Sequence, residues 1–177
     1  GEFLDWDDSL NFVLNENYRG LAWENLKWMF TTFHMNHYQP LAWLTLGIDY
    51  CLWGMNPFGY HLTAIILHSF NSVLFFLLCL VFFKSMASDA GSHGLFPYNN
   101  HSENIMLWPA FMAAVFFAWH PLRAESVSWI TERRDLLCGF FYLSSLLAYF
   151  KYAAFEKEYA EQTGKALPEN TGNKMFI

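Results

Sequence analysis

This sequence has few charged residues and few cysteines, and its basic residues are fewer than its acidic ones. Only 15% of its 177 residues are Asp, Glu, Lys or Arg, against about 25% in soluble domains, and the formal net charge is −6. A nucleic-acid-binding module needs a basic face, so that class is excluded. Three cysteines without CxxC spacing exclude a disulfide scaffold and a cysteine zinc site. No glycine-rich phosphate loop, HExxH or GxSxG motif is present.

Hydrophobic residues make up 54% of the chain and gather into three uncharged runs. The runs cover 33 residues from Cys51 to Phe83, 19 residues from Asn104 to Leu122 and 15 residues from Leu136 to Phe150. About 20 apolar residues in a helix cross a bilayer core of about 30 Å. The first run is also too long and too apolar on every face for the core helix of a soluble protein. We therefore expect an all-α, polytopic membrane protein with about three spans.

The segments around these runs divide the chain. Residues 1–58 are rich in aromatic side chains and carry apolar residues at helical spacing over 23–33 and 41–53, which predicts a helical loop domain outside the membrane. We then expect a span over 59–83, a polar connector over 84–104, a span over 105–121, a charged loop over 122–135, a span over 136–154 and a polar tail over 155–177. Three spans would put the loop domain and the charged loop on the same face of the membrane.

Two features concern the chain as a whole. It begins without Met and ends on an apolar Met-Phe-Ile sequence, from which we expect a fragment of a larger membrane protein. Five Lys and Arg residues fall on each side of the three expected spans, so the positive-inside rule gives no orientation.

Three carboxylates fall within four residues near the N-terminus: Asp5, Asp7 and Asp8. Carboxylates this close raise one another's pKa, bind a divalent cation or supply a general base. The alternative is a solvated acidic turn that begins a helix, because short Asp clusters of that kind are common.

A histidine pair follows in the same loop domain. His34 and His37 share a face if their segment is helical, and together with the aspartates they could ligate a metal. Pro40 favours an extended segment and a structural role instead. A divalent cation therefore stays open, and no other cofactor is indicated.

The loop between the second and third runs is dense in charge at a membrane boundary. It contains His120, Arg123 and Glu125, then Arg133 and Arg134. Arginine at this depth suits a phosphate or diphosphate, through its planar fork, or a lipid head group. The alternative is interfacial anchoring with Glu–Arg pairing.

Three polar residues interrupt the first run: His61, His68 and Asn71. Their spacing turns them roughly one way on a helix. Polar groups inside a span usually hydrogen-bond a neighbouring helix, so we expect helix–helix packing rather than catalysis.

Several patterns, taken in order, resemble one family. They are Phe3-Leu4-Asp5-Trp6-Asp7-Asp8, Gly20-Leu21-Ala22-Trp23, Asn36-His37-Tyr38-Gln39-Pro40-Leu41, Gly54-Met55-Asn56-Pro57, and His120-Pro121-Leu122-Arg123-Ala124-Glu125 with Glu132-Arg133-Arg134-Asp135. Together they resemble the N-terminal membrane region of bacterial TPR-containing proteins related to the TMTC O-mannosyltransferases, which are glycosyltransferases of the GT-C fold. The resemblance covers about residues 3–153.

The resemblance implies an enzyme of the bacterial inner membrane whose first loop faces the periplasm. Such an enzyme moves a sugar, for example mannose, from a polyprenyl-phosphate donor to an acceptor hydroxyl on protein or glycan. The bilayer, the donor and the acceptor are then the expected partners, and the fragment alone would be inactive. The alternative is a membrane scaffold that kept the fold and lost the transferase site.

The same resemblance assigns roles to the candidate residues. Asp7 or Asp8 would be the catalytic base, with Asp5 beside them on the substrate side. The segment His37, Tyr38, Gln39 and Pro40 would line the acceptor or donor groove, although Gln39 stands where many relatives have His. Our electrostatic reading goes beyond the family pattern: it places Arg123, Arg133 and Arg134, with His120 and Glu125, where the lipid-linked phosphate leaves.

Overall fold

A computed structural model of the chain describes residues 13–92 and 102–163, and every regular element in these two ranges is a helix. The prediction of an all-α protein is therefore confirmed. In chain order the elements are α1 (Trp23–Thr31), α2 (Pro40–Trp53), α3 (Pro57–Ser92), α4 (Ser102–Trp119), α5 (Arg123–Ser128), the 3₁₀ helix η2 (Ile130–Glu132) and α6 (Arg133–Thr163).

Two segments in the described ranges are long and apolar enough to cross a membrane: Pro57–Met86 and Ile130–Ala160. A third apolar helical segment, Met106–Trp119, is shorter. Of the three expected spans, the first and third therefore meet the length requirement in full, and the second is the short one. Together they make this an all-α membrane protein.

The long helices extend beyond the expected bounds. α3 begins at Pro57 and continues to Ser92, well into the expected polar connector, and α6 continues to Thr163. Proline is tolerated in the first helical turn because its missing N–H would have no partner there. A polar sequence can continue a helix past an apolar run, because the backbone hydrogen bonds close within the helix itself.

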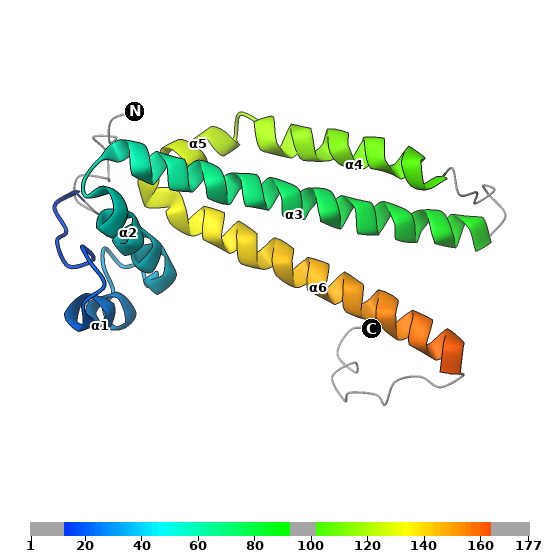
Figure 1. Cartoon of the computed structure of the whole chain (residues 1–177), viewed down its shortest axis with the longest axis horizontal. Helices are drawn as coiled ribbons and strands as arrows, with labels where there is room; N and C mark the ends of the chain where they lie inside the picture. The colour runs from blue at the N-terminus through cyan, green and yellow to red at the C-terminus, as the bar shows by residue number, and fades with distance from the viewer. Residues whose placement is uncertain (1–12, 93–101, 164–177) are drawn as a thin grey trace.

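α3 is the central helix of the bundle. α4 runs along α3. α6 begins near the N-terminal end of α3 and diverges from α3 toward its own C-terminus (Figure 1). The Asn71 side-chain amide donates to the Leu136 carbonyl on α6 at 2.9 Å, and His68 Nε2 lies 3.1 Å from the Ala118 carbonyl oxygen on α4. The packing role expected for His68 and Asn71 is thus seen in the structure. The buried Nε2 of His61 has no hydrogen-bond partner.

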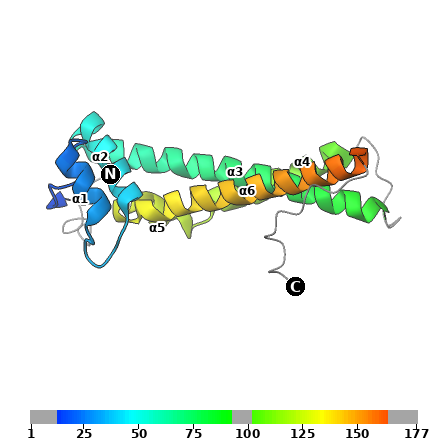
Figure 2. The ribbon, with the colours of Figure 1, turned by 90° about the horizontal axis from the view of Figure 1, so that it is seen from below.

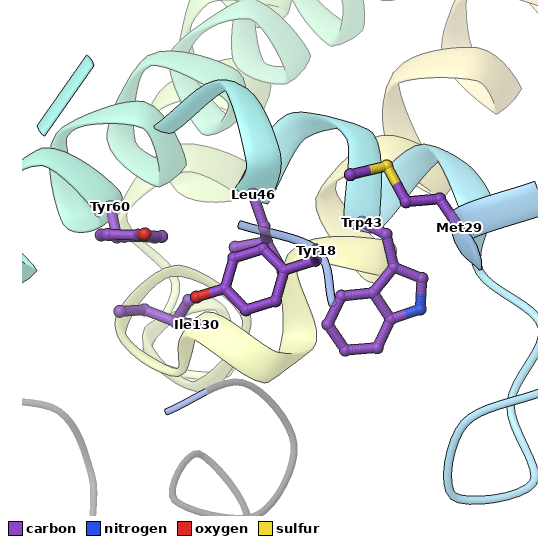
Figure 3. Close-up of a cluster of buried hydrophobic side chains, with 6 residues drawn as sticks. All are labelled: Tyr18, Met29, Trp43, Leu46, Tyr60 and Ile130. Atoms are coloured by element: carbon purple, nitrogen blue, oxygen red, sulfur yellow. The ribbon is translucent and has the colours of Figure 1, made fainter. Parts of the chain in front are cut away.

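α1 and α2 form a helical unit at one end of the bundle, which we call the N-terminal unit (residues 13–56) (Figure 1; Figure 2). Its helices match the apolar spacing expected over 23–33 and 41–53. A cluster of buried side chains joins it to the start of α3 and to η2 (Figure 3); the members are Tyr18, Met29, Trp43, Leu46, Tyr60 and Ile130.

Aromatic rings and one glycine make this packing close. The Tyr18 and Trp43 ring centroids are 5.7 Å apart, and the Trp28 and Trp43 rings meet edge to face at 5.3 Å. A Cβ on Gly47 would lie 2.8 Å from Met29 Cε and 2.9 Å from the Tyr18 carbonyl oxygen. Glycine at position 47 therefore lets the chain around Tyr18 approach α2.

Candidate functional site

An ion pair joins the N-terminal unit to the bundle where α2, α3 and α6 meet. Arg133 Nη1 lies 2.8 Å from Asp49 Oδ2, and the two side chains are only 0% and 2% exposed. Arg133 Nη2 donates to the Tyr60 carbonyl at 2.9 Å, and the Thr63 hydroxyl donates to Asp49 Oδ1 at 2.7 Å. We call these four residues the junction.

Burial dominates the electrostatics of the junction. It raises the pKa of the Asp49 carboxyl above its usual value, while Arg133 and Thr63 act in the opposite direction. A buried ion pair adds little net stability, because desolvation offsets the attraction, but losing one partner leaves an uncompensated buried charge. The junction therefore fixes how α2 sits against the start of α6 more than it stabilises the fold.

The structure revises the expectation for Arg133. This side chain faces Asp49 inside the protein and presents no surface to a lipid phosphate. Arg134 is partly exposed, and its Nη2 lies 2.6 Å from Glu132 Oε1, so the Glu–Arg pairing alternative holds for it. The sequence could not distinguish the two neighbouring arginines, since helix geometry turns them in different directions.

Two other predicted residues of this region, His120 and Arg123, line a groove between α3 and α4. Its volume is about 440 Å³, and we call it the cationic groove; its lining residues are Phe75, Ala113, Phe116, Phe117, His120, Leu122 and Arg123. The Arg123 guanidinium lies 4.6 Å from the centroid of the Phe117 ring, a cation–π distance. His120 Nδ1 accepts from the Leu122 N–H at 3.2 Å, and its ring meets Phe116 edge to face at 4.9 Å.

This groove suits an amphiphile with an anionic head. Its walls are phenylalanine rings, alanine and leucine, while a guanidinium and an imidazole stand where α4 ends and α5 begins. Arginine binds phosphate through paired N–H groups, and the aromatic walls are apolar. Glu125, also predicted as a site residue, is exposed on α5 and is not among the residues that line the groove.

The predicted segment His37–Pro40 connects a hairpin turn to the start of α2. His34 and His37 exchange two backbone hydrogen bonds of 3.1 and 2.9 Å around Met35 and Asn36, which both have positive φ. Two-residue hairpin turns require this backbone geometry. Of the two alternatives for the histidines, the extended one is correct. Gln39 caps α2 and Pro40 begins it, while the side chains of His37 and Tyr38 are exposed.

The acidic residues Asp5, Asp7 and Asp8 lie outside the described residues, so their roles remain predictions. Over residues 13–92 and 102–163, the structure has no group of three His, Cys, Asp or Glu side chains that could hold a metal ion.

Sequence reasoning missed the junction. Asp49 is the only charged residue between Pro40 and Trp53, in a helix that is otherwise apolar or neutral. A single carboxylate in such a helix requires a buried cationic partner, and this signal was available. The sequence could not identify Arg133 as that partner, because Arg133 is distant from Asp49 in the sequence and is followed by another arginine.

These observations define the class: an all-α membrane protein whose helical N-terminal unit is joined to the bundle by a buried ion pair. Neither a protein-family model nor a solved structure matches the chain. Curated relatives do match it, and all three described below are named protein O-mannosyl-transferases.

The chain is related to the TMTC proteins. It is 34% identical to human TMTC4 over 163 residues, which is 85% of this chain and 20% of that protein. It is 32% identical to Drosophila melanogaster Tmtc3 over 64% of this chain, and 33% identical to Xenopus laevis tmtc2 over 66% of this chain. The chain thus spans a fifth of the human relative and 12% of the other two.

Proposed function

We propose that this chain is part of a membrane glycosyltransferase of the GT-C type, which transfers mannose from a polyprenyl-phosphate donor to a hydroxyl on an acceptor protein. The observation that carries the proposal is the similarity to human TMTC4, which extends over 85% of the chain. The name of that relative gives the reaction class. The donor is inferred from the cationic groove.

The groove supports a lipid-linked phosphate as the donor. A polyprenyl phosphate has one anionic group and a long apolar chain. Arg123 and His120 are placed to meet the anionic group, and the rings of Phe75, Phe116 and Phe117 offer an apolar wall to the chain. A soluble nucleotide sugar has no long apolar chain to lie along such a wall.

The position of the N-terminal unit supports a single site. Val13, the first described residue, packs against the core cluster beside the junction. Asp8 is five residues earlier, so a fully extended chain holds it within about 18 Å of Val13. The carboxylates can therefore reach substrates only near this end of the bundle, toward which α5 runs from the α4–α5 connection (Figure 1).

The proposed chemistry is a displacement at the sugar. Asp7 or Asp8 removes the proton from the acceptor hydroxyl as its oxygen attacks the anomeric carbon. The bond from that carbon to the phosphate oxygen breaks, and the polyprenyl phosphate leaves with the electron pair. Arg123 balances the developing negative charge on the phosphate. Under this proposal the N-terminal unit faces the periplasm of a bacterial inner membrane.

The test is a transfer assay on the full-length protein in lipid nanodiscs, with polyprenyl-phosphate mannose and acceptor. The Asp7→Asn and Asp8→Asn variants and the double variant are compared with wild type. We expect one single variant and the double variant to lose at least about a hundredfold in rate, the lower range for a general base. Glu16→Gln, an exposed carboxylate in the same unit, serves as the control. Unchanged transfer in the double variant would overturn the assignment of Asp7 or Asp8 as the catalytic base, and absence of transfer by the wild type would favour the scaffold alternative.

A further inference from the structure

One face of the N-terminal unit is apolar and is not used by the core. α1 buries Met29 and packs Leu26 against the core cluster, yet Trp23 is 74% exposed and Phe30 is 47% exposed. Positions 23, 27 and 30 share one side of a helix, so Lys27 lies between the two aromatic side chains. A helix that is apolar on two sides needs a second apolar environment.

The turn after α1 extends this surface. Phe33 is 72% exposed, and its ring centroid lies 5.2 Å from that of Tyr38. The Tyr38 hydroxyl donates to the Phe30 carbonyl at 3.0 Å, which holds the turn against the end of α1. We call the surface of these five residues the aromatic face; its members are Trp23, Lys27, Phe30, Phe33 and Tyr38.

The unit that carries the aromatic face cannot move away from the ends of the spans. Only Gly54, Met55 and Asn56 separate α2 from α3, and the Asp49–Arg133 ion pair holds α2 to the start of α6. Both views show α1 and α2 at the end of the bundle where α3 and α6 begin, and α2 runs across α3 rather than along it (Figure 1; Figure 2). The aromatic face therefore lies beside the spans at their boundary.

Other exposed aromatic residues mark the same boundary. Phe58 is in the first turn of α3 and Trp53 is the last residue of α2; both are exposed, and their ring centroids lie 6.3 Å apart. Tryptophan and tyrosine gather where a bilayer meets water, because one part of the ring system is apolar and the other is wet. The aromatic face, on α1 and the turn after it, adds further exposed aromatic residues beside the end of the bundle.

We propose that the aromatic face of the N-terminal unit lies in the head-group region of the bilayer, with Trp23, Phe30 and Phe33 toward the acyl chains. Lys27 then meets the phosphates of anionic lipids. This contact sets the height of the unit above the membrane. The inference depends on the membrane assignment and not on transferase activity.

Site-directed spin labelling of the full-length protein in phosphatidylcholine–phosphatidylglycerol nanodiscs tests this. In a background where Cys51, Cys79 and Cys138 are serine, labels are placed by Trp23→Cys and Phe30→Cys, and by the controls Glu24→Cys and Thr31→Cys. Each pair is seven residues apart, so the pairs lie on two adjacent sides of α1. All four positions are exposed. Collision rates with oxygen, which enters lipid, are compared with those of a water-soluble nickel chelate.

The two pairs should give opposite results. Positions 23 and 30 should show an oxygen-to-nickel collision ratio severalfold higher than positions 24 and 31. Equal ratios at all four positions, with free access of nickel, would show that the face lies in water and would overturn the proposal. Low collision rates with both reagents at 23 and 30 would show that protein covers the face, which also overturns it.

Discussion

The guanidinium of Arg133, at the start of α6, lies 2.8 Å from the carboxylate of Asp49 on α2, and both side chains are excluded from solvent. This pair joins the N-terminal unit to α6, one of the two helices that are long and apolar enough to cross a membrane. Two charges buried together are costly to separate, because each would remain in a medium that cannot solvate it. Their contact is therefore the main constraint on how the two parts of the chain are arranged.

Breaking the pair from one side should be more damaging than replacing it. We expect Arg133→Met or Asp49→Leu alone to lower the free energy of unfolding by about 3–5 kcal/mol, and the double change Asp49→Leu with Arg133→Met to restore most of the loss. Denaturant titration in mixed micelles measures this. Arg134→Gln is the control, since its partly exposed ion pair is worth about 1 kcal/mol or less. Additive losses in the double variant would contradict the assignment.

A second prediction concerns the contact between α3 and α6. The Asn71 amide donates to the Leu136 carbonyl, and a Cβ on Gly139 would lie 3.2 Å from Asn71 Nδ2. Asn71→Ala should cost about 0.6–1.7 kcal/mol, the range for polar contacts between membrane helices. Gly139→Ala should be less favourable in the wild type than when position 71 is Ala, because the contact with the Asn71 amide is then absent. A double-mutant cycle checks this, and equal costs in both backgrounds would show that the two residues do not interact.

Gly54 provides a third prediction. It ends α2 with φ 61° and ψ −133°, a combination outside the left-handed helical region that Asn tolerates. Gly54→Ala and Gly54→Asn should therefore both lower stability by about 1–3 kcal/mol. No atom lies within 4 Å of a Cβ built there, so the loss would come from the backbone alone. Asn36→Gly, at φ 64° in the hairpin turn, is the matched control and should be close to neutral. Recovery by Asn at position 54 would argue against this explanation.

A fourth prediction tests the cationic groove. Arg123→Gln should raise the KM for a polyprenyl-phosphate donor about tenfold to a hundredfold, the equivalent of one charge-assisted hydrogen bond. Arg123→Lys should recover only part of this, because an ammonium cannot form the paired contacts of a guanidinium. Lys84→Gln, near the other end of α3, controls for the loss of one positive charge. If the KM for the donor is unchanged in both Arg123 variants, the groove does not bind the donor.

How much the sequence could predict depended on whether a signal was local. The apolar run from Cys51 to Phe83 predicted the central helix, and polar residues inside that run predicted its contacts with neighbours. His68 and Asn71 indeed face α4 and α6. The helix ends were predicted less well, because a helix continues through polar residues once its backbone hydrogen bonds are established.

Contacts between distant segments could not be predicted. The two arginines at 133 and 134 are equivalent in a sequence, and only the fold shows that one is buried and the other partly exposed. The turn at Met35 and Asn36 could not be predicted from the sequence either, because Met rarely adopts positive φ. The acidic segment, on which the catalytic prediction depends, lies outside the described residues and stays a prediction.

The proposal that the acidic segment and the cationic groove serve one reaction is tested most directly by mapping which side of the membrane each occupies. In the cysteine-free full-length protein, single cysteines introduced by Ser9→Cys, His93→Cys and Ser126→Cys are labelled from outside with an impermeant reagent. We predict that positions 9 and 126 react and that position 93 reacts only after the membrane is opened. Labelling of 9 and 126 from opposite sides would contradict both the three-span arrangement and the shared site.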